Sequence, residues 1–305
     1  MNDLPLVSVL LPSYNHDKYV EEAIMSVVNQ SYTNIELIVI DDGSTDNSPR
    51  IIEALSKKYN FKFYLQSNVG LVKTLDRLLQ YANGKYISII ASDDVYDGNK
   101  ISLLVDFLEG HKAYDMVYAK IKIIDQHSKI ISSVDEDYKS GNIFPNLLCG
   151  DFFINGVTAL IRADTYKLYK RSDLYIEDFQ FWLKIAKSHK IGFVDKYLAF
   201  YRVHDNHLSS NLLKMQEAEY QTISKYKNEV TYSEALRQWT LKWLGEAIEQ
   251  DKVYALRFLP KLLYVKNLYN KVFYKLIVKL IMPRFIWKFI KQSVKPSNGK
   301  FLWKK

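Results

Sequence analysis

The chain has 305 residues, of which 48% are hydrophobic and 25% are charged. This composition is typical of a folded globular protein and excludes collagen-like, low-complexity and disordered classes. The single cysteine, Cys149, excludes an internal disulfide and a cysteine-based metal cluster, and it favours a reducing compartment. The net charge is +8, but residues 253–305 contain 13 Lys and Arg and no Asp or Glu, which leaves −5 for residues 1–252.

Strand and helix patterns alternate through the first hundred residues. Short apolar runs predict strands at residues 7–11, 35–40, 61–65 and 86–90. Apolar residues spaced three or four apart predict helices at residues 20–28, 49–59 and 72–82, between those strands. This order predicts an α/β fold with a mostly parallel central sheet and flanking helices, similar to a Rossmann fold.

The second half of the chain changes character. Between residues 115 and 205 the pattern is mixed, with strands expected at 116–124 and 191–203 and a helix at 176–188. From residue 212 onward nearly every segment has a helical pattern. We therefore expect an α/β domain over residues 1–210 and a helical region over residues 211–305.

Three polar clusters follow predicted strands, at Pro12–Asn15, Asp41–Asp46 and Ser92–Asp94. Ligands of open α/β sheets bind beyond the carboxyl ends of the strands. None of the clusters is a glycine-rich phosphate loop, which disfavours a dinucleotide oxidoreductase or a P-loop enzyme. Asp93 and Asp94 could supply oxygen ligands to Mg²⁺ or Mn²⁺. The alternative is that the two aspartates are turn and cap residues.

Several motifs occur together in a specific order. They are Val7–Asn15, Ser26–Tyr32, Glu36–Asp46, Asn68–Gly70, Ser92–Asp94, Glu177–Asp178 and Tyr201–His204. In this combination the chain resembles the family 2 glycosyltransferases over about residues 5–210. The resemblance implies a GT-A fold, an inverting reaction and a nucleotide-sugar donor.

The resemblance also assigns residues to the donor. Tyr14 matches the position that flanks the nucleotide base, and Asp41 matches a carboxylate that contacts the base, usually uracil, with Asp42 close by. Arg202 would offset the charge of the leaving group. The remaining residues expected at the donor site are Pro12, Asn68 and Ser92.

The same resemblance implies a divalent cation, Mn²⁺ or Mg²⁺. Asp93 matches the second aspartate of the family's D-x-D metal motif, but Ala91 occupies the first position. The contact that the first aspartate of the motif makes with the ribose or the metal would be weaker in this chain, or it would be transferred to Asp94. His204 is expected near the diphosphate or its metal, with a packed, hydrogen-bonded histidine as the alternative. For His16 and the four other histidines we expect the packed role.

Glu177 and Asp178 resemble the catalytic-base motif of the family. An inverting displacement needs a base that takes the proton from the acceptor hydroxyl. We expect Asp178 to be this base and Glu177 to orient the acceptor. The alternative is an acidic pair placed favourably at a helix N-terminus.

Basic and apolar residues alternate in the C-terminal segment. From Leu268 onward both series step by three or four, which places them on different faces of helices broken near Pro283. We expect basic amphipathic helices that lie on an anionic membrane surface. Simple helical packing or oligomerisation is the alternative, and nucleic acid is not expected.

Together these features predict a bacterial hexosyltransferase that moves a sugar from a UDP donor to a saccharide acceptor. The acceptor would be linked to a polyprenyl diphosphate, in O-antigen or capsule-type polysaccharide synthesis. No spanning helix or signal peptide is recognised, so we expect a cytoplasmic protein, peripheral on the inner face of the membrane. One alternative is a sugar-1-phosphate nucleotidyltransferase, although the loop after the first strand is neither glycine-rich nor basic. The other, favoured only by Ala91, is a non-catalytic protein that docks on membranes or binds saccharides.

Overall fold

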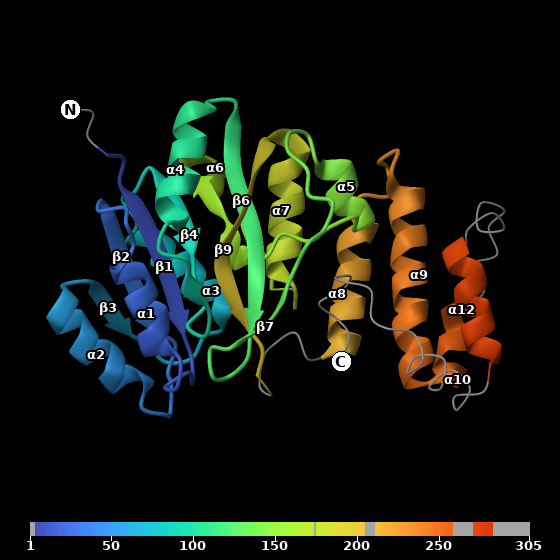
Figure 1. Ribbon diagram of the computed structural model, residues 1–305, viewed down its shortest axis with the longest axis horizontal. Coiled ribbons are helices and arrows are strands. Elements are labelled where there is room, and N and C mark those ends of the chain that lie inside the picture. Colours follow the sequence, from blue (N-terminus) through green and yellow to red (C-terminus); the bar gives the residue numbers. More distant parts are fainter. Residues whose placement is uncertain (1–3, 174, 205–210, 259–270, 283–305) are drawn as a thin grey trace. The chain divides into compact units, whose positions relative to one another are not determined.

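The computed structural model describes residues 4–173, 175–204, 211–258 and 271–282 (Figure 1). These residues form two compact units. The first contains residues 4–144 and 152–204, and the second contains residues 145–151 together with the described residues from Asn211 onward. Each unit is described by itself.

A mostly parallel sheet forms the centre of the first unit. Its strands are β1 (Val7–Ser13), β2 (Ile35–Asp41), β3 (Lys62–Leu65), β4 (Tyr86–Ile89), β5 (Val95–Tyr96), β6 (Tyr114–Ile124), β7 (Ile130–Ser133), β8 (Leu160–Arg162) and β9 (Lys190–Arg202). The strand order is β3-β2-β1-β4-β8-β6-β9-β5, and β7 pairs with β6. The pairs of β1 with β2 and β4, of β2 with β3, and of β6 with β9 are parallel. The predicted parallel sheet is confirmed, and three short strands add antiparallel pairs to it: β5, β7 and β8.

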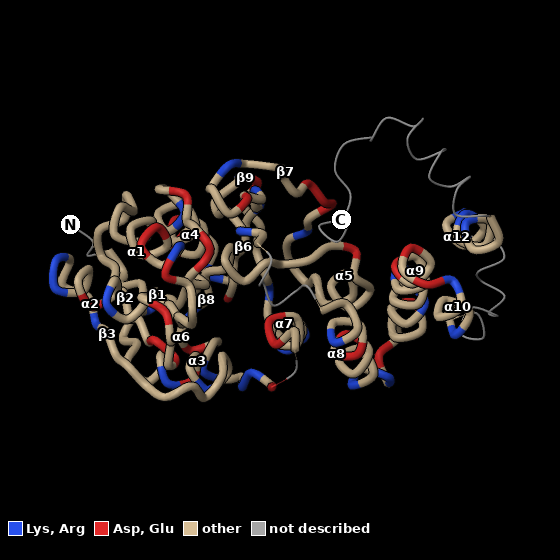
Figure 2. Tube along the Cα trace, turned by 90° about the horizontal axis from the view of Figure 1, so that it is seen from below, with Lys and Arg blue, Asp and Glu red and all other residues tan. Residues whose placement is uncertain are grey.

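Helices cover both faces of this sheet. They are α1 (Val20–Val28), α2 (Ser48–Tyr59), α3 (Leu71–Gln80), α4 (Lys100–Gly110), α6 (Ala163–Leu168) and α7 (Glu177–Ser188). Figure 2 shows α1 and α4 on one face and α3 and α6 on the other. Every residue of β1 is buried, as expected for a parallel strand covered on both faces.

The carboxyl ends of the parallel strands meet at one edge of the sheet. Ser13 at the end of β1 pairs with Asp41 at the end of β2. Ile124 at the end of β6 pairs with Arg202 at the end of β9. Because β4 is parallel to β1, the residues that follow it, 90–94, lie at this edge as well. The pairing register of the strands therefore brings the three polar clusters and the end of β9 together at the carboxyl edge of the sheet.

The second unit is helical in its described residues. It contains most of α5 (Phe144–Cys149), α8 (Leu212–Ser224), α9 (Tyr232–Gln250), α10 (Lys252–Ala255), the short 3₁₀ helix η3 (Leu256–Phe258) and α12 (Lys271–Ile281). Helices α8, α10 and α12 each pack against α9. Residues 259–270 and 283–305, which carry most of the predicted basic tail, lie outside the described residues. No helix among the described residues is long and apolar enough to cross a membrane.

Candidate active site

Asp41 joins the loops that follow β1 and β2. Its carboxylate accepts hydrogen bonds from Ser13 Oγ at 3.1 Å, from Ser44 Oγ at 2.7 Å and from Ser44 N at 2.8 Å. The Asp41 side chain is fully buried. Its oxygens thus hold the ends of two strands together, whereas the sequence analysis expected a contact with the nucleotide base. Pro12, also expected at the donor, is buried within β1, where it pairs with Ile40.

Four further hydrogen bonds join the same two loops. They run from Asn15 N to Ser44 Oγ (2.8 Å), from Thr45 N to Asn15 Oδ1 (2.8 Å), from His16 N to Ser48 Oγ (3.1 Å) and from Asp17 N to Asp46 Oδ2 (2.9 Å). Asn15 has a positive φ of 51°, a conformation that Asn tolerates better than most residues. The β1–α1 loop is therefore fixed. It presents Tyr14 with 46% of its surface exposed, as a residue that stacks on a base requires.

Asp42 fixes a third loop at the same edge. Its carboxylate accepts hydrogen bonds from the backbone N–H groups of Val69 and Gly70, both at 2.9 Å, where α3 begins. Gly43 has a φ of +76°, and a Cβ on it would lie 2.7 Å from Asn68 N. Only glycine allows this close approach. The arrangement places the exposed Asn68 beside the Asp42–Gly43 turn.

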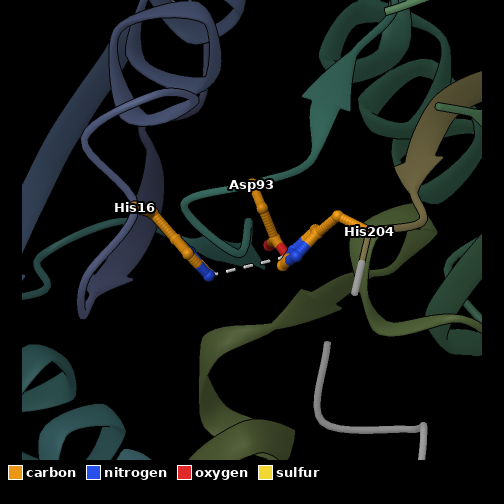
Figure 3. A group of neighbouring side chains, drawn as sticks. All are labelled: His16, Asp93 and His204. Atoms are coloured by element: carbon orange, nitrogen blue, oxygen red, sulfur yellow. Dashed lines mark hydrogen bonds and ion pairs between the residues drawn. The ribbon is translucent and has the colours of Figure 1, made fainter. Parts of the chain in front are cut away.

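Three ligand-bearing side chains converge at the carboxyl edge of the sheet: His16, Asp93 and His204 (Figure 3). Nε2 of His204 lies 3.1 Å from Asp93 Oδ2, and Nε2 of His16 lies 4.0 Å from the same oxygen. The three ligand atoms all lie within 4.8 Å of one another. His16 comes from the loop after β1, Asp93 from the segment after β4, and His204 from just beyond β9.

The histidines control the charge of Asp93. Burial by itself would raise the pKa of this carboxyl, but the hydrogen bond with His204 and the charges of His16 and His204 outweigh it and lower the pKa. Asp93 is therefore kept as the carboxylate, the form that binds a cation. The buried Ser92 places its Oγ 2.8 Å from His16 Nδ1. Ser92, predicted to contact the donor, thus supports a neighbouring histidine.

The chemistry of this group fits a divalent cation. Carboxylate oxygens suit Mg²⁺ and Mn²⁺, and imidazole nitrogens suit the softer transition metals. Two imidazoles and one carboxylate leave positions around one ion for the oxygens of a substrate. His16, Asp93 and His204 are therefore the residues that would hold a metal here.

Asp94, predicted as a possible metal ligand, is not part of this group. It is buried, and its Oδ1 accepts the backbone N–H of Arg202 at 3.0 Å. Burial, and then the neighbouring charge of Asp93, raise the pKa of Asp94 well above its ordinary value. Asp94 therefore belongs to the framework of the site.

Arg202 also occupies a different place from the one expected. The side chain is fully buried, and its guanidinium lies over the ring of Tyr19, 4.9 Å from the centroid. It donates hydrogen bonds to Asp93 O (2.7 Å), Asp125 O (3.0 Å), Ser128 Oγ (2.9 Å) and Glu22 Oε2 (2.6 Å). The protein itself surrounds and engages the guanidinium in this structure, and the contact of Arg202 with the leaving group stays a prediction.

Asp178 lies in the first turn of α7, where Glu177 is the first residue. Helix α7 ends one residue before β9 begins, so it runs back along the sheet and its N-terminus lies toward the carboxyl edge. Burial, and then the charge of Glu177, raise the pKa of Asp178 to about 7, although Arg171 opposes the shift. Asp178 keeps some surface exposure. A partly exposed carboxyl with a pKa near neutrality can act as a general base.

Glu177 has a separate partner. Arg171 Nη1 lies 3.1 Å from Glu177 Oε1, and the guanidinium stacks on Phe181 at 4.4 Å. The backbone of Gly156 passes close to the other carboxyl, since a Cβ on this residue would lie 4.0 Å from Asp178 Oδ2. The two carboxylates therefore have different surroundings. Glu177 binds the buried Arg171, and Asp178 faces the segment at Gly156.

His16 is the functional candidate that the sequence analysis did not select. The sequence alone predicts for His16 the same packed role as for the other histidines. The sequence did contain a signal for His16, because it follows the carboxyl end of the first strand directly. The segments that contain Asp93 and His204 lie at the same edge of the sheet.

Comparisons with known proteins identify the family of the chain. The family model described as glycosyl transferase family 2 matches residues 8–174. A protein of Haemophilus influenzae described as an uncharacterized glycosyltransferase is 31% identical over 256 residues, which are 76% of this chain and 75% of that protein.

Solved structures support the fold. The chain is similar to S. aureus TarS 1–349 in complex with UDP-GlcNAc, with a TM-score of 0.61 and 18% identity over 90% of this chain and 81% of that one. It is also similar to the mannosyltransferase PcManGT from Pyrobaculum calidifontis, in complex with GDP-Man and Mn²⁺. There the TM-score is 0.58 and the identity 16%, over 94% of this chain and 88% of that one. The expected GT-A fold is confirmed. With the family model covering more than half of its residues, this chain belongs to glycosyl transferase family 2.

Proposed function

We propose that this glycosyltransferase is inverting and dependent on a divalent cation, and that it transfers a hexose or N-acetylhexosamine from a UDP donor to a saccharide acceptor. The observation that carries the proposal is the Asp178 carboxyl, whose pKa of about 7 suits a base at neutral pH. Its helix begins toward the sheet edge where His16, Asp93 and His204 converge.

The reaction is a single displacement. The acceptor hydroxyl oxygen attacks the anomeric carbon, the bond from that carbon to the diphosphate oxygen breaks, and Asp178 takes the hydroxyl proton. The bond electrons leave with the diphosphate, and the configuration at the anomeric carbon inverts, so an α-linked donor gives a β-linkage. General-base assistance of this kind contributes roughly 10²–10⁴ in rate.

The donor end of the site uses different groups. The exposed ring of Tyr14 offers a surface on which a nucleotide base can stack. When bound to His16, Asp93 and His204, a divalent cation would neutralise charge that develops on the diphosphate. Asp41 and Asp42 keep the surrounding loops in place. Support for a nucleotide-sugar donor comes from TarS and PcManGT, whose complexes hold UDP-GlcNAc and GDP-Man with Mn²⁺.

We further propose that the acceptor is linked to a polyprenyl diphosphate, in O-antigen or capsule-type synthesis on the inner face of the membrane. Two features support this part. The chain's positive charge is concentrated in residues 253–305. The part of this segment in α12 exposes Lys275, Val278 and Ile281, a basic and apolar combination that suits an anionic lipid surface.

A donor panel tests the proposal. UDP-sugars and GDP-mannose are incubated with the full-length protein and Mn²⁺, and slow donor hydrolysis is followed by nucleotide release. We expect hydrolysis of a UDP-sugar that stops in EDTA and returns when Mn²⁺ is restored. Undiminished turnover in EDTA would contradict the metal-dependent mechanism, and turnover of GDP-mannose alone would contradict the UDP assignment. Release of the free sugar first as the α-anomer from an α-linked donor would contradict inversion.

A further inference from the structure

We propose that His16 is a ligand of the cation, held in position by Ser92, and that it makes the site prefer Mn²⁺ to Mg²⁺. The inference rests on the proposed metal-dependent function and names the residue that determines the choice of metal. It explains how the site can bind a cation although Ala91 stands at the first position of the D-x-D motif.

The separations of the two histidine nitrogens from Asp93 are compatible with ligands on one ion. Ligands about 2.1 Å from a small divalent cation lie about 3 Å apart when adjacent and about 4.2 Å apart when opposite. His204 Nε2 and His16 Nε2 lie 3.1 Å and 4.0 Å from Asp93 Oδ2. The 4.0 Å separation is too long for a hydrogen bond between His16 and Asp93, yet it suits two ligands on one ion.

Ser92 orients the imidazole of His16. Its Oγ lies 2.8 Å from Nδ1, which directs Nε2 toward Asp93. When Nδ1–H donates to Ser92, the lone pair of the neutral ring is on Nε2, the form that binds a metal. The main chain is held too, because His16 N donates to Ser48 Oγ at 3.1 Å. The ring is thus prepared as a ligand before any cation arrives.

The type of ligand determines the preferred metal. An aspartate at position 91 would add an oxygen, the donor that Mg²⁺ requires. Position 91 is alanine, whose methyl group offers no ligand, and the neighbouring loop contributes a nitrogen from His16 instead. Imidazole favours first-row transition metals over Mg²⁺. With two imidazoles and one carboxylate, the site should bind Mn²⁺ more tightly than Mg²⁺.

Metal binding by the full-length protein tests the inference without relying on turnover. Mn²⁺ and Mg²⁺ are titrated separately by calorimetry into the wild type and into the variants His16→Ala, His16→Asp and Ser92→Ala. We expect His16→Ala to weaken Mn²⁺ binding at least tenfold with little effect on Mg²⁺, and His16→Asp to reduce the preference for Mn²⁺. Loss of the supporting hydroxyl in Ser92→Ala should weaken Mn²⁺ binding about 10–100-fold. His127→Ala is the matched control, because His127 is exposed on the turn between β6 and β7.

A spectroscopic measurement keeps the test decisive if His16→Ala folds poorly. Pulsed electron paramagnetic resonance of bound Mn²⁺ should detect two coupled imidazole nitrogens in the wild type and one in His16→Gln. Unchanged Mn²⁺ affinity in a folded His16→Ala variant, or the same nitrogen couplings in His16→Gln, would overturn the role of His16. If those results came with Mn²⁺-dependent turnover, the proposed function would stand and only this inference would fail. Turnover unaffected by EDTA would instead remove the proposed metal-dependent function.

Discussion

Arg202 holds both aspartates that follow β4. Its Nε donates to the carbonyl oxygen of Asp93 at 2.7 Å, and its backbone N–H donates to Asp94 Oδ1 at 3.0 Å. The same guanidinium reaches Ser128 and Glu22. Two residues therefore position Asp93. The buried Arg202 at the end of β9 binds its carbonyl oxygen, and His204, just beyond the same strand, contacts its carboxylate.

Replacing Arg202 by lysine should cost both stability and metal affinity. An ammonium group cannot reproduce the planar set of bonds or the stacking on Tyr19, so several buried acceptors lose their donor. We expect a loss of about 2–5 kcal/mol in the free energy of unfolding, measured by urea denaturation at pH 7. Arg237→Lys is the control, because the side chain of Arg237 is 17% exposed and its partner Glu234 lies three residues away on the same helix. Equal losses in the free energy of unfolding for the two variants would show that Arg202 does not stabilise the site.

Asp93→Asn should remove metal-dependent nucleotide binding without unfolding the protein. The amide is nearly isosteric with the carboxylate but lacks the negative charge that a cation needs. We expect UDP to bind the variant equally well with Mn²⁺ or with EDTA, whereas the wild type should bind UDP more tightly with Mn²⁺. Calorimetry measures the binding, and circular dichroism checks the fold. A Mn²⁺-dependent gain that persists in Asp93→Asn would contradict the assignment.

Transfer should increase with pH through about 7. The base acts only when deprotonated, and burial together with Glu177 raises the pKa of Asp178 to about 7. Below this value kcat/KM should fall about tenfold per pH unit. Asp178→Asn should bind the donor normally, lower transfer by roughly 10²–10⁴, and lose this acid limb. A normal rate in Asp178→Asn would remove the residue from the mechanism.

Glu177→Gln is the informative companion variant. The charge of Glu177 raises the pKa of Asp178, and the charge of Arg171 lowers it. When the Glu177 carboxylate is removed, the charge of Arg171 still lowers the pKa of Asp178. The acid limb of the rate profile should therefore move to lower pH. A limb that stays at the same pH while the rate collapses would instead identify Glu177 as the base.

The same pKa makes a prediction about stability. Asp178 binds its proton more tightly in the folded state than in the unfolded chain, where its pKa is near the ordinary 3.8. Its contribution to stability is therefore fully present below about pH 4 and is lost as the pH rises to about 7. Asp178→Asn should melt at the same temperature as the wild type at pH 4 and at a higher temperature at pH 8. Equal melting temperatures at pH 8 would contradict the raised pKa.

The parallel part of the sheet was predictable because its signal is local. Buried strands such as β1 and β2 are continuous apolar runs, and the helices between them have a clear period. The antiparallel additions were not predictable in the same way. Strands β5 and β8 have only two and three residues, and their pairing depends on partners far along the chain.

The sequence predicts several residues that lie at the candidate site, but it does not predict the contacts that they make. The spacing of motifs selected Asp93, Asp178 and His204, whose contacts are consistent with those roles. The burial of Arg202 was not predictable because it results from strand pairing at the end of β9. His16 was missed because its ring is oriented by Ser92, 76 positions away. Such contacts are set by tertiary packing, which local patterns do not contain.

The exposed face of α12 provides a test of membrane docking. The apolar side chains Val278 and Ile281 are 54% and 78% exposed. This helix contains lysines but no Asp or Glu, and Figure 2 shows blue and no red on it. The lysines were expected to share one basic face, but Lys279 is buried and forms an ion pair with Glu249 at 2.5 Å. Its neighbour Leu276 is also buried, against Gly245 of α9.

Point variants are therefore a better test than deletion of residues from 253 onward, which would also remove packed side chains such as Leu276. We expect the double variant Val278→Asp and Ile281→Asp to pellet about tenfold less with anionic phosphatidylglycerol vesicles, because it loses apolar insertion and adds repulsion. Val230→Asp is the control, since Val230 is 98% exposed and lies outside α12. Donor hydrolysis in solution should not change, because the donor-site residues belong to the first unit. Equal pelleting of the double variant and Val230→Asp would show that α12 does not carry the protein to the membrane, and its buried face against α9 would then be its whole role.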